Sequence, residues 1–212
     1  ANTAWAFAMV SQPDAQLFAA LAMATERRVS DFGMQELANT AWASAMVSQL
    51  DAQLFAALAM AGEWHVSDFS MQDLANTAWA FATASQRDAP LFAALTSAAE
   101  RRVVGFIAQD LANTAWAFAT ASQREAPLFA ALARAAERRL GGFIAQDLTN
   151  TAWAYATAEH SAARLLVALA RVAEWRVGDL NEQALANKKR AYVYLEHSDA
   201  TLLVALARVA ER

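Results

Sequence analysis

The residues that could do chemistry in this sequence are amides, hydroxyls and aromatic rings that recur at a fixed spacing. The motif Asn-Thr-Ala-Trp occurs five times, and its successive tryptophans are 37 residues apart. An Asn side chain can pair with the edge of a nucleobase, and an indole ring can stack on its face. The motif therefore favours binding over catalysis. Its tryptophans are Trp5, Trp42, Trp79, Trp116 and Trp153.

Catalysis and metal binding find little support among the other polar residues. The chain has no cysteine, which excludes disulfides and thiolate metal or redox sites. His160 and His197 occupy equivalent turns in adjacent copies of the motif, but helices packed about 8–10 Å apart make a shared zinc ion awkward. The run at 196–199 has the letters of a catalytic triad, yet a triad is assembled in space and not from neighbours. We expect neither an enzyme nor a metal, a cofactor or a small-molecule substrate.

Composition indicates a helical protein. The 212 residues are 57% hydrophobic, with six glycines, three prolines and abundant alanine. This mixture is too apolar for a disordered chain and has too little glycine and proline for an all-β fold. Each apolar run meets a charged residue before it reaches the about 20 residues that a membrane-spanning helix needs. We therefore expect an all-α, soluble, intracellular protein without membrane insertion.

The repeat extends over the whole chain, so we expect a single helical-repeat array with no internal domain boundary. The sixth unit is partial, and the first begins inside a helix. We therefore expect a fragment of a longer protein that lacks upstream repeats. The units occupy residues 1–37, 38–74, 75–111, 112–148, 149–185 and 186–212.

Each unit is predicted to form two helices, as the third unit illustrates. Ser70 can cap the first helix, with an acid three residues later to complete a capping box, and this helix is predicted over residues 71–85. A tight turn follows. Pro90 then fits the first turn of a second helix, where its missing N–H costs little, and this helix is predicted to end near Val103.

On a helical wheel the first helix has four faces. One carries Leu and Phe, one only alanine, one Asn76 and Trp79, and one Asp73 and Thr77. We expect the last face, which begins with an acid in units two to five, to be exposed. The tryptophans are then core residues, with base stacking as the alternative. Three covered faces are typical of an α-solenoid, here of six 37-residue helix-turn-helix repeats, whose superhelix we expect to be right-handed.

The stretch Gln-Asp-Leu-Ala-Asn-Thr-Ala-Trp-Ala-Phe-Ala at residues 72–82 resembles the heptatricopeptide and octotricopeptide repeats of algal and protist organelles. The 37-residue period is closest to the heptatricopeptide branch. The resemblance implies an α-solenoid of a plastid or mitochondrion that binds single-stranded RNA and affects its processing, stability or translation. Related helical repeats read about one base per repeat from the inner helix. The resemblance thus implies as RNA-binding residues Asn39, Thr40, Asn76, Thr77, Asn113, Thr114, Asn150, Thr151, Asn187, Lys188, Lys189 and Arg190.

Each of these residue groups also has a structural interpretation. The identical Asn residues can form a ladder that caps neighbouring backbone, because identical readers would select only a homopolymeric tract. The Lys-Lys-Arg run at 188–190 can be the polar cap of the terminal repeat instead of a phosphate contact. A column of arginines near the ends of the second helices favours the helix dipole, and phosphate contact is its alternative role. This column contains Arg28, Arg102, Arg139 and Arg176, and the phosphate alternative applies to the last three.

Charge divides the chain and supports a second hypothesis. Residues 1–74 carry two basic and eight acidic residues, and residues 75–212 carry 15 basic and 13 acidic ones. RNA affinity depends on phosphate neutralisation, so RNA binding should favour the C-terminal part. The acidic first part and the near-identical units favour the alternative, a protein-binding scaffold or structural subunit of a larger organellar complex. Trp64 and Trp175, which stand where other repeats have Arg101 and Arg138, are candidates for its partner surface.

Overall fold

All secondary structure in the described part of the chain is helical. It comprises eight α-helices, α3 to α10, and three 3₁₀ helices, η2 to η4, with no strand among these residues. The all-α prediction is therefore confirmed there. No helix in this part combines the length and the apolarity that crossing a bilayer requires. The computed structural model describes residues 31–46, 51–160 and 162–175, with Ala20, Met23, Ala24, Arg27 and Arg28.

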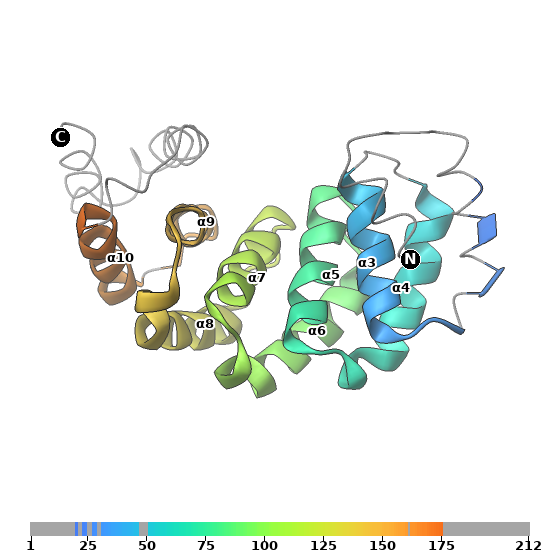
Figure 1. Cartoon of the computed structure of the whole chain (residues 1–212), viewed down its shortest axis with the longest axis horizontal. Coiled ribbons are helices and arrows are strands. Elements are labelled where there is room, and N and C mark those ends of the chain that lie inside the picture. Colours follow the sequence, from blue (N-terminus) through green and yellow to red (C-terminus); the bar gives the residue numbers. More distant parts are fainter. Residues whose placement is uncertain are drawn as a thin grey trace. The chain divides into compact units, whose positions relative to one another are not determined.

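The described residues fall into two compact units, divided between Arg102 and Val103. In the first unit, α3 (Met34–Met46) and α5 (Met71–Thr83) lie side by side (Figure 1). The following helices, α4 (Ala52–His65) and α6 (Ala89–Arg102), pack against each other and against the helix that precedes each in the chain. The 3₁₀ helix η2 (Val66–Asp68) follows α4 and also contacts α6.

The second unit repeats this arrangement. Helices α7 (Ala108–Thr120) and α9 (Ala145–Thr157) lie side by side, and α8 (Ala126–Arg139) packs against α10 (Ala163–Trp175). Two 3₁₀ helices, η3 (Val103–Gly105) and η4 (Leu140–Gly142), contact α8. We call α3, α5, α7 and α9 the A helices, and α4, α6, α8 and α10 the B helices. Within each unit, neighbouring A helices form one layer and neighbouring B helices form another.

Alanine lines the buried sides of the A helices, as the wheel predicts. In α5, the side chains of Ala75, Ala78 and Ala82 are buried, and Ala38 and Ala41 are buried at the equivalent places in α3. A methyl group is the smallest side chain that still excludes water, so it lets two helices approach closely. This explains how α3 and α5 pack along their lengths.

Aromatic rings join α4 to α5 and α8 to α9, in each case a B helix to the A helix of the following repeat. Phe55 of α4 meets Phe81 of α5 edge to face, with ring centroids 5.1 Å apart. Phe129 of α8 meets Tyr155 of α9 in the same way at 5.3 Å, and the Tyr155 hydroxyl donates a 2.6 Å hydrogen bond to the Phe129 carbonyl. Such aromatic pairs contribute about 0.5–1.5 kcal/mol beyond their buried area.

Helices α5, α7 and α9 end in a Schellman motif that lacks glycine. Helix α5 ends at Thr83, two residues before the predicted end, because Ser85 takes a left-handed φ of 55°. The Ser85 amide donates to the Ala82 carbonyl, and the Gln86 amide donates to the Phe81 carbonyl. Ser122 and Glu159 adopt φ of 60° and 57° after α7 and α9. Left-handed geometry closes the helix by satisfying its last carbonyls.

Acidic residues hold the start of each A helix. The Ser70 Oγ accepts from the Asp73 amide at 3.1 Å, and the Asp73 carboxylate accepts from the Ser70 amide at 3.0 Å, which confirms the predicted capping box. Isoleucine stands at the capping position of α7 and α9 and has no acceptor. There Asp110 and Asp147 still accept from the amide at the capping position, at 3.1 and 3.0 Å. The acids on this side of the helix are therefore structural.

Candidate nucleic-acid interface

The exposed face of the A helices is not the one expected from the wheel. Asp73 and Thr77, on the face predicted to be exposed, are buried, whereas Gln72 is exposed and Asn76 and Trp79 are half-buried. The small threonine packs among alanines and the aspartate turns back to the helix start, so both can be covered. The large indole ring is left at the surface. The prediction that the tryptophans are core residues is therefore wrong for the described A helices.

The face that results carries two amides and an indole ring in each A helix. We call it the amide–tryptophan face. The glutamines, one turn before each asparagine, are exposed, while the asparagines and tryptophans are half-buried. Sequence reasoning missed the glutamines, although their invariant spacing from Asn was visible. The face consists of Gln35, Asn39, Trp42, Gln72, Asn76, Trp79, Gln109, Asn113, Trp116, Gln146, Asn150 and Trp153.

The tryptophans of neighbouring A helices contact one another. The ring centroids of Trp42 and Trp79 are 6.2 Å apart with planes tilted by 32°, and those of Trp116 and Trp153 are 6.0 Å apart with a tilt of 33°. Each unit therefore presents a continuous, half-exposed aromatic surface across two repeats. Such a surface can stack bases irrespective of their sequence.

The asparagine side chains beside these rings are not engaged by the protein. Among the residues that the structure describes, no hydrogen bond joins the side-chain amide of Asn39, Asn76, Asn113 or Asn150 to another protein group. An Asn ladder that caps neighbouring backbone is therefore not observed within this part of the chain. Each amide keeps two donors and an acceptor available to a ligand.

The predicted threonine contacts lie out of reach of a base. Thr40, Thr77, Thr114 and Thr151 are only 4%, 3%, 2% and 1% exposed. The Thr40 hydroxyl donates to the Glu36 carbonyl at 2.7 Å. The threonines therefore belong to the packing of the A helices, and Asn alone of each predicted Asn-Thr pair faces the surface.

The arginine column contacts neighbouring protein where the structure describes it. The half-buried Arg102 places a guanidinium nitrogen 3.2 Å from the sulfur of Met71, at the start of α5. Arg139 is exposed and donates to the carbonyl of Val104 in η3. Both arginines thus tie the end of a B helix to a preceding segment. The remaining predicted site residues, Arg176, Asn187, Lys188, Lys189 and Arg190, lie outside the described residues.

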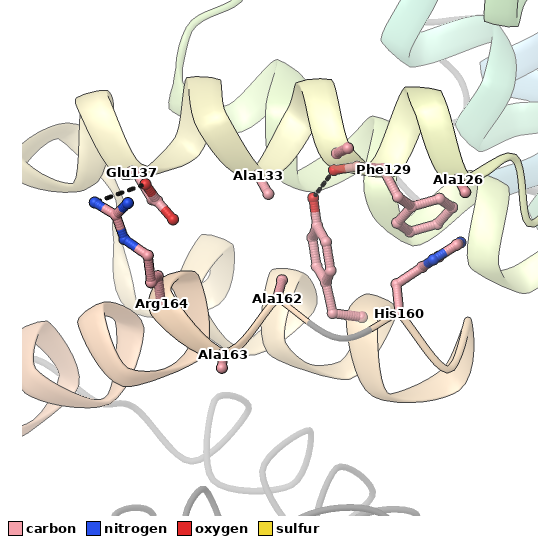
Figure 2. Close-up of a pocket in the computed structure, with 10 residues that line it drawn as sticks. Ala126, Phe129, Ala133, Glu137, His160, Ala162, Ala163 and Arg164 are labelled. Carbon is pink, nitrogen blue, oxygen red and sulfur yellow. Dashed lines mark hydrogen bonds and ion pairs between the residues drawn. The ribbon is translucent and has the colours of Figure 1, made fainter.

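An open groove of about 500 Å³ lies between α8 and α10 in the second unit (Figure 2). Half of its lining residues are alanines. At one end the His160 ring stacks on Phe129, with centroids 4.5 Å apart. At the other end Arg164 and Glu137 approach to 4.0 Å (Figure 2). The His160 ring and the Arg164–Glu137 pair thus lie at opposite ends of the groove, and their polar atoms do not point to a common place (Figure 2).

The groove does not assemble a reactive group from its lining residues. Burial raises the pKa of the Tyr155 hydroxyl, and the nearby Glu137 adds to this effect. Tyr155 therefore stays protonated as the donor to the Phe129 carbonyl. Within the described ranges, no three His, Cys, Asp or Glu side chains come close enough together to hold a metal ion. The amide–tryptophan face is the stronger candidate site.

The chain matches no model of a known protein family and no curated protein. The resemblance to heptatricopeptide and octotricopeptide repeats therefore rests on the residues of the repeat itself.

Proposed function

We propose that the chain binds single-stranded RNA on the amide–tryptophan face. One observation carries this proposal: in every described A helix, an Asn amide without a protein partner lies one turn from a half-exposed tryptophan. Single-stranded RNA is recognised by just this combination, because its unpaired bases can stack on aromatic rings while their edges form hydrogen bonds.

The proposal also covers the architecture of the chain and the cellular compartment in which it acts. Within each compact unit, the side-by-side packing of two A helices and of two B helices supports an α-solenoid in which the 37-residue repeats continue in register. The resemblance of the repeat supports a member of the heptatricopeptide or octotricopeptide group, acting in a plastid or mitochondrion on RNA processing, stability or translation. In this proposal the protein acts by binding alone.

Phosphate contacts have to come from outside the amide–tryptophan face. The four described A helices contain no lysine or arginine. The exposed arginines Arg87 and Arg124 lie in the turns that follow α5 and α7, close in sequence to the ends of these helices. Arg124 also pairs with Glu159 at 3.2 Å, with both side chains largely exposed. Such an exposed pair is weak, so its arginine can exchange the carboxylate for a phosphate.

A salt titration of RNA binding tests the proposal. Fluorescence anisotropy of a labelled single-stranded RNA of mixed sequence would be measured with the full chain over a range of salt concentrations. We expect binding at low salt and a linear fall of log affinity with log salt, because counterions are released from neutralised phosphates. Duplex RNA of equal length is the control and should bind more weakly, since its bases are paired. The proposal would be refuted if no RNA bound at low salt, or if the affinity did not change with salt concentration.

A protein-binding scaffold is the second candidate, and the exposed side of α4 favours it. Met60 and Trp64, one turn apart, are 58% and 77% exposed. Large apolar side chains exposed together mark protein contact surfaces more often than RNA contacts. A scaffold that uses α4 has no reason to bind RNA, so the same titration separates the two functions.

A further inference from the structure

We infer that the RNA bound by the amide–tryptophan face is an adenine-rich single strand, with one adenine held by each A helix. The inference rests on the proposed function and specifies its ligand. It concerns two neighbouring helices in each unit, α3 with α5 and α7 with α9.

The amide–tryptophan face carries the same residues in all four described A helices. Gln72 and Asn76 of α5 have identical counterparts in α3, α7 and α9, each followed by a tryptophan one turn beyond the asparagine. Helices that present the same amides and the same ring to solvent select the same base. A strand that satisfies all of them is therefore a tract of one nucleotide.

The N6/N7 edge of adenine fits the side-chain amide of an asparagine. A carboxamide can accept from the N6 amino group of adenine and donate to N7 at the same time. Guanine presents two acceptors, O6 and N7, at the same edge, and these are matched by arginine or lysine. The described A helices carry neither residue.

Stacking favours a purine over a pyrimidine, because the larger ring system covers more of an indole surface. A base cannot enter between the paired tryptophans, because stacking on both sides would require about 6.8 Å, twice the 3.4 Å rise of a stack. The observed centroid distances are 6.2 and 6.0 Å. Each base therefore stacks on the solvent side of one indole, while its edge reaches the asparagine one turn away.

Homopolymer binding tests the inference. The affinities of the full chain for oligo-adenylate, oligo-uridylate and oligo-cytidylate of equal length would be compared by anisotropy at one salt concentration. We expect oligo-adenylate to bind at least about tenfold more tightly, as each bidentate amide–base pair discriminates by that order or more. An oligonucleotide of N6,N6-dimethyladenosine keeps the ring but has no N6 donor, and it should lose this advantage.

Side-chain variants test which residues select the base. The double substitution Asn39→Leu and Asn76→Leu removes two amides at nearly constant volume, and Gln53→Leu on the exposed side of α4 is the matched control. We expect the double variant to show a smaller adenine preference than the wild type, because the first unit no longer selects the base, while its affinity for oligo-uridylate is retained. Replacement of the same residues by Gln should restore part of the preference. Circular dichroism and Tm would establish that the variants fold.

The results of these experiments distinguish the adenine inference from the proposed binding of single-stranded RNA. Equal affinity for the three homopolymers, or preference for a pyrimidine tract, would overturn the adenine inference and leave RNA binding intact. A double variant whose adenine preference is as large as that of the wild type would also overturn it. Failure of all RNAs to bind at low salt would refute the proposed function together with the inference.

Discussion

The indole rings of Trp42 and Trp79 lie 6.2 Å apart on neighbouring helices, at equivalent positions of successive repeats. Trp116 and Trp153 reproduce this relationship in the second unit at 6.0 Å and almost the same tilt. Two pairs with the same geometry indicate that the 37-residue spacing places the two indoles of each compact unit side by side at the surface. A ring that served the core alone would be buried, as Phe81 of α5 and Phe118 of α7 are.

The buried threonines provide a test of stability. The hydroxyls of Thr77 and Thr114 have no hydrogen-bond partner in the structure, whereas that of Thr40 donates to the Glu36 carbonyl. Removing an unpaired buried hydroxyl should stabilise, so we expect Thr77→Val and Thr114→Val each to raise the free energy of unfolding by roughly 1 kcal/mol. Thr40→Val, the control, should give no such gain. Urea unfolding measures the difference.

The same variants also bear on RNA binding. Because these threonines are buried, Thr77→Val and Thr114→Val should leave the affinity for single-stranded RNA unchanged. A marked loss of affinity without a change in fold would mean that the threonines do contact the ligand.

Glycine at the ends of the A helices should stabilise the protein. Ser85 and Ser122 adopt left-handed backbone angles that cost a residue with a Cβ about 1 kcal/mol and cost glycine almost nothing. We expect Ser85→Gly and Ser122→Gly to raise Tm. Ala93→Gly at an exposed position inside α6 is the opposite control and should lower Tm, by the helix propensity difference of about 1 kcal/mol. A lower Tm for the serine variants would contradict the account of these helix ends.

The capping aspartates predict a pH dependence. Burial raises the pKa of Asp110 and of Asp147, against the opposing effect of the amides of Ile107 and Ile144. A carboxyl with a higher pKa in the folded than in the unfolded chain contributes stability when protonated, and this contribution is lost as pH rises through the folded pKa. The wild type should therefore gain stability relative to an Asp110→Asn, Asp147→Asn double variant as pH falls from neutral toward about 4.

Urea unfolding over this pH range would measure the difference between the two proteins. The exposed Gln72→Asn, which removes no titratable group, provides the control, and its difference from the wild type should stay constant over this range. A difference between wild type and double variant that stays constant or shrinks on acidification would contradict the desolvation of these carboxyls.

The basic run at 188–190 is predicted to strengthen RNA binding. We expect replacement of Lys188, Lys189 and Arg190 by Ala to weaken the affinity for single-stranded RNA much more than Arg27→Ala with Arg28→Ala. The acidic part of the chain surrounds the latter pair in sequence, and in the structure Arg28 already pairs with Asp31 at 3.2 Å. A shallower salt slope for the triple variant would identify lost phosphate contacts. Equal effects of the two sets would count against the charge argument.

Local sequence signals predicted the helix pairs well. Ser70 caps α5, and Pro90 lies in the first turn of α6, as expected. Capping and the tolerance for proline depend on residues within one turn, so a single sequence carries the information. The left-handed ends were missed because serine stands where glycine usually signals them.

Which face of an A helix meets solvent could not be predicted from the wheel. Thr77 is more polar than Trp79, and polarity alone would expose the threonine. The structure buries it because a small side chain fits between closely packed helices and the indole does not. The choice depends on contacts between repeats, which one helix in isolation does not contain. The site residues were thus found by type and spacing, but the role of the tryptophans required the structure.

The most direct test of the central claim compares tryptophans on the two kinds of helix. Trp42→Ala with Trp153→Ala alters the amide–tryptophan face of both units, whereas Trp64→Ala removes the 77% exposed indole of α4. With folding verified by circular dichroism, the double variant should bind single-stranded RNA about tenfold or more weakly, as expected for lost base stacking, and Trp64→Ala should bind like the wild type. If Trp64→Ala weakens RNA binding and the double variant does not, RNA does not lie on the amide–tryptophan face.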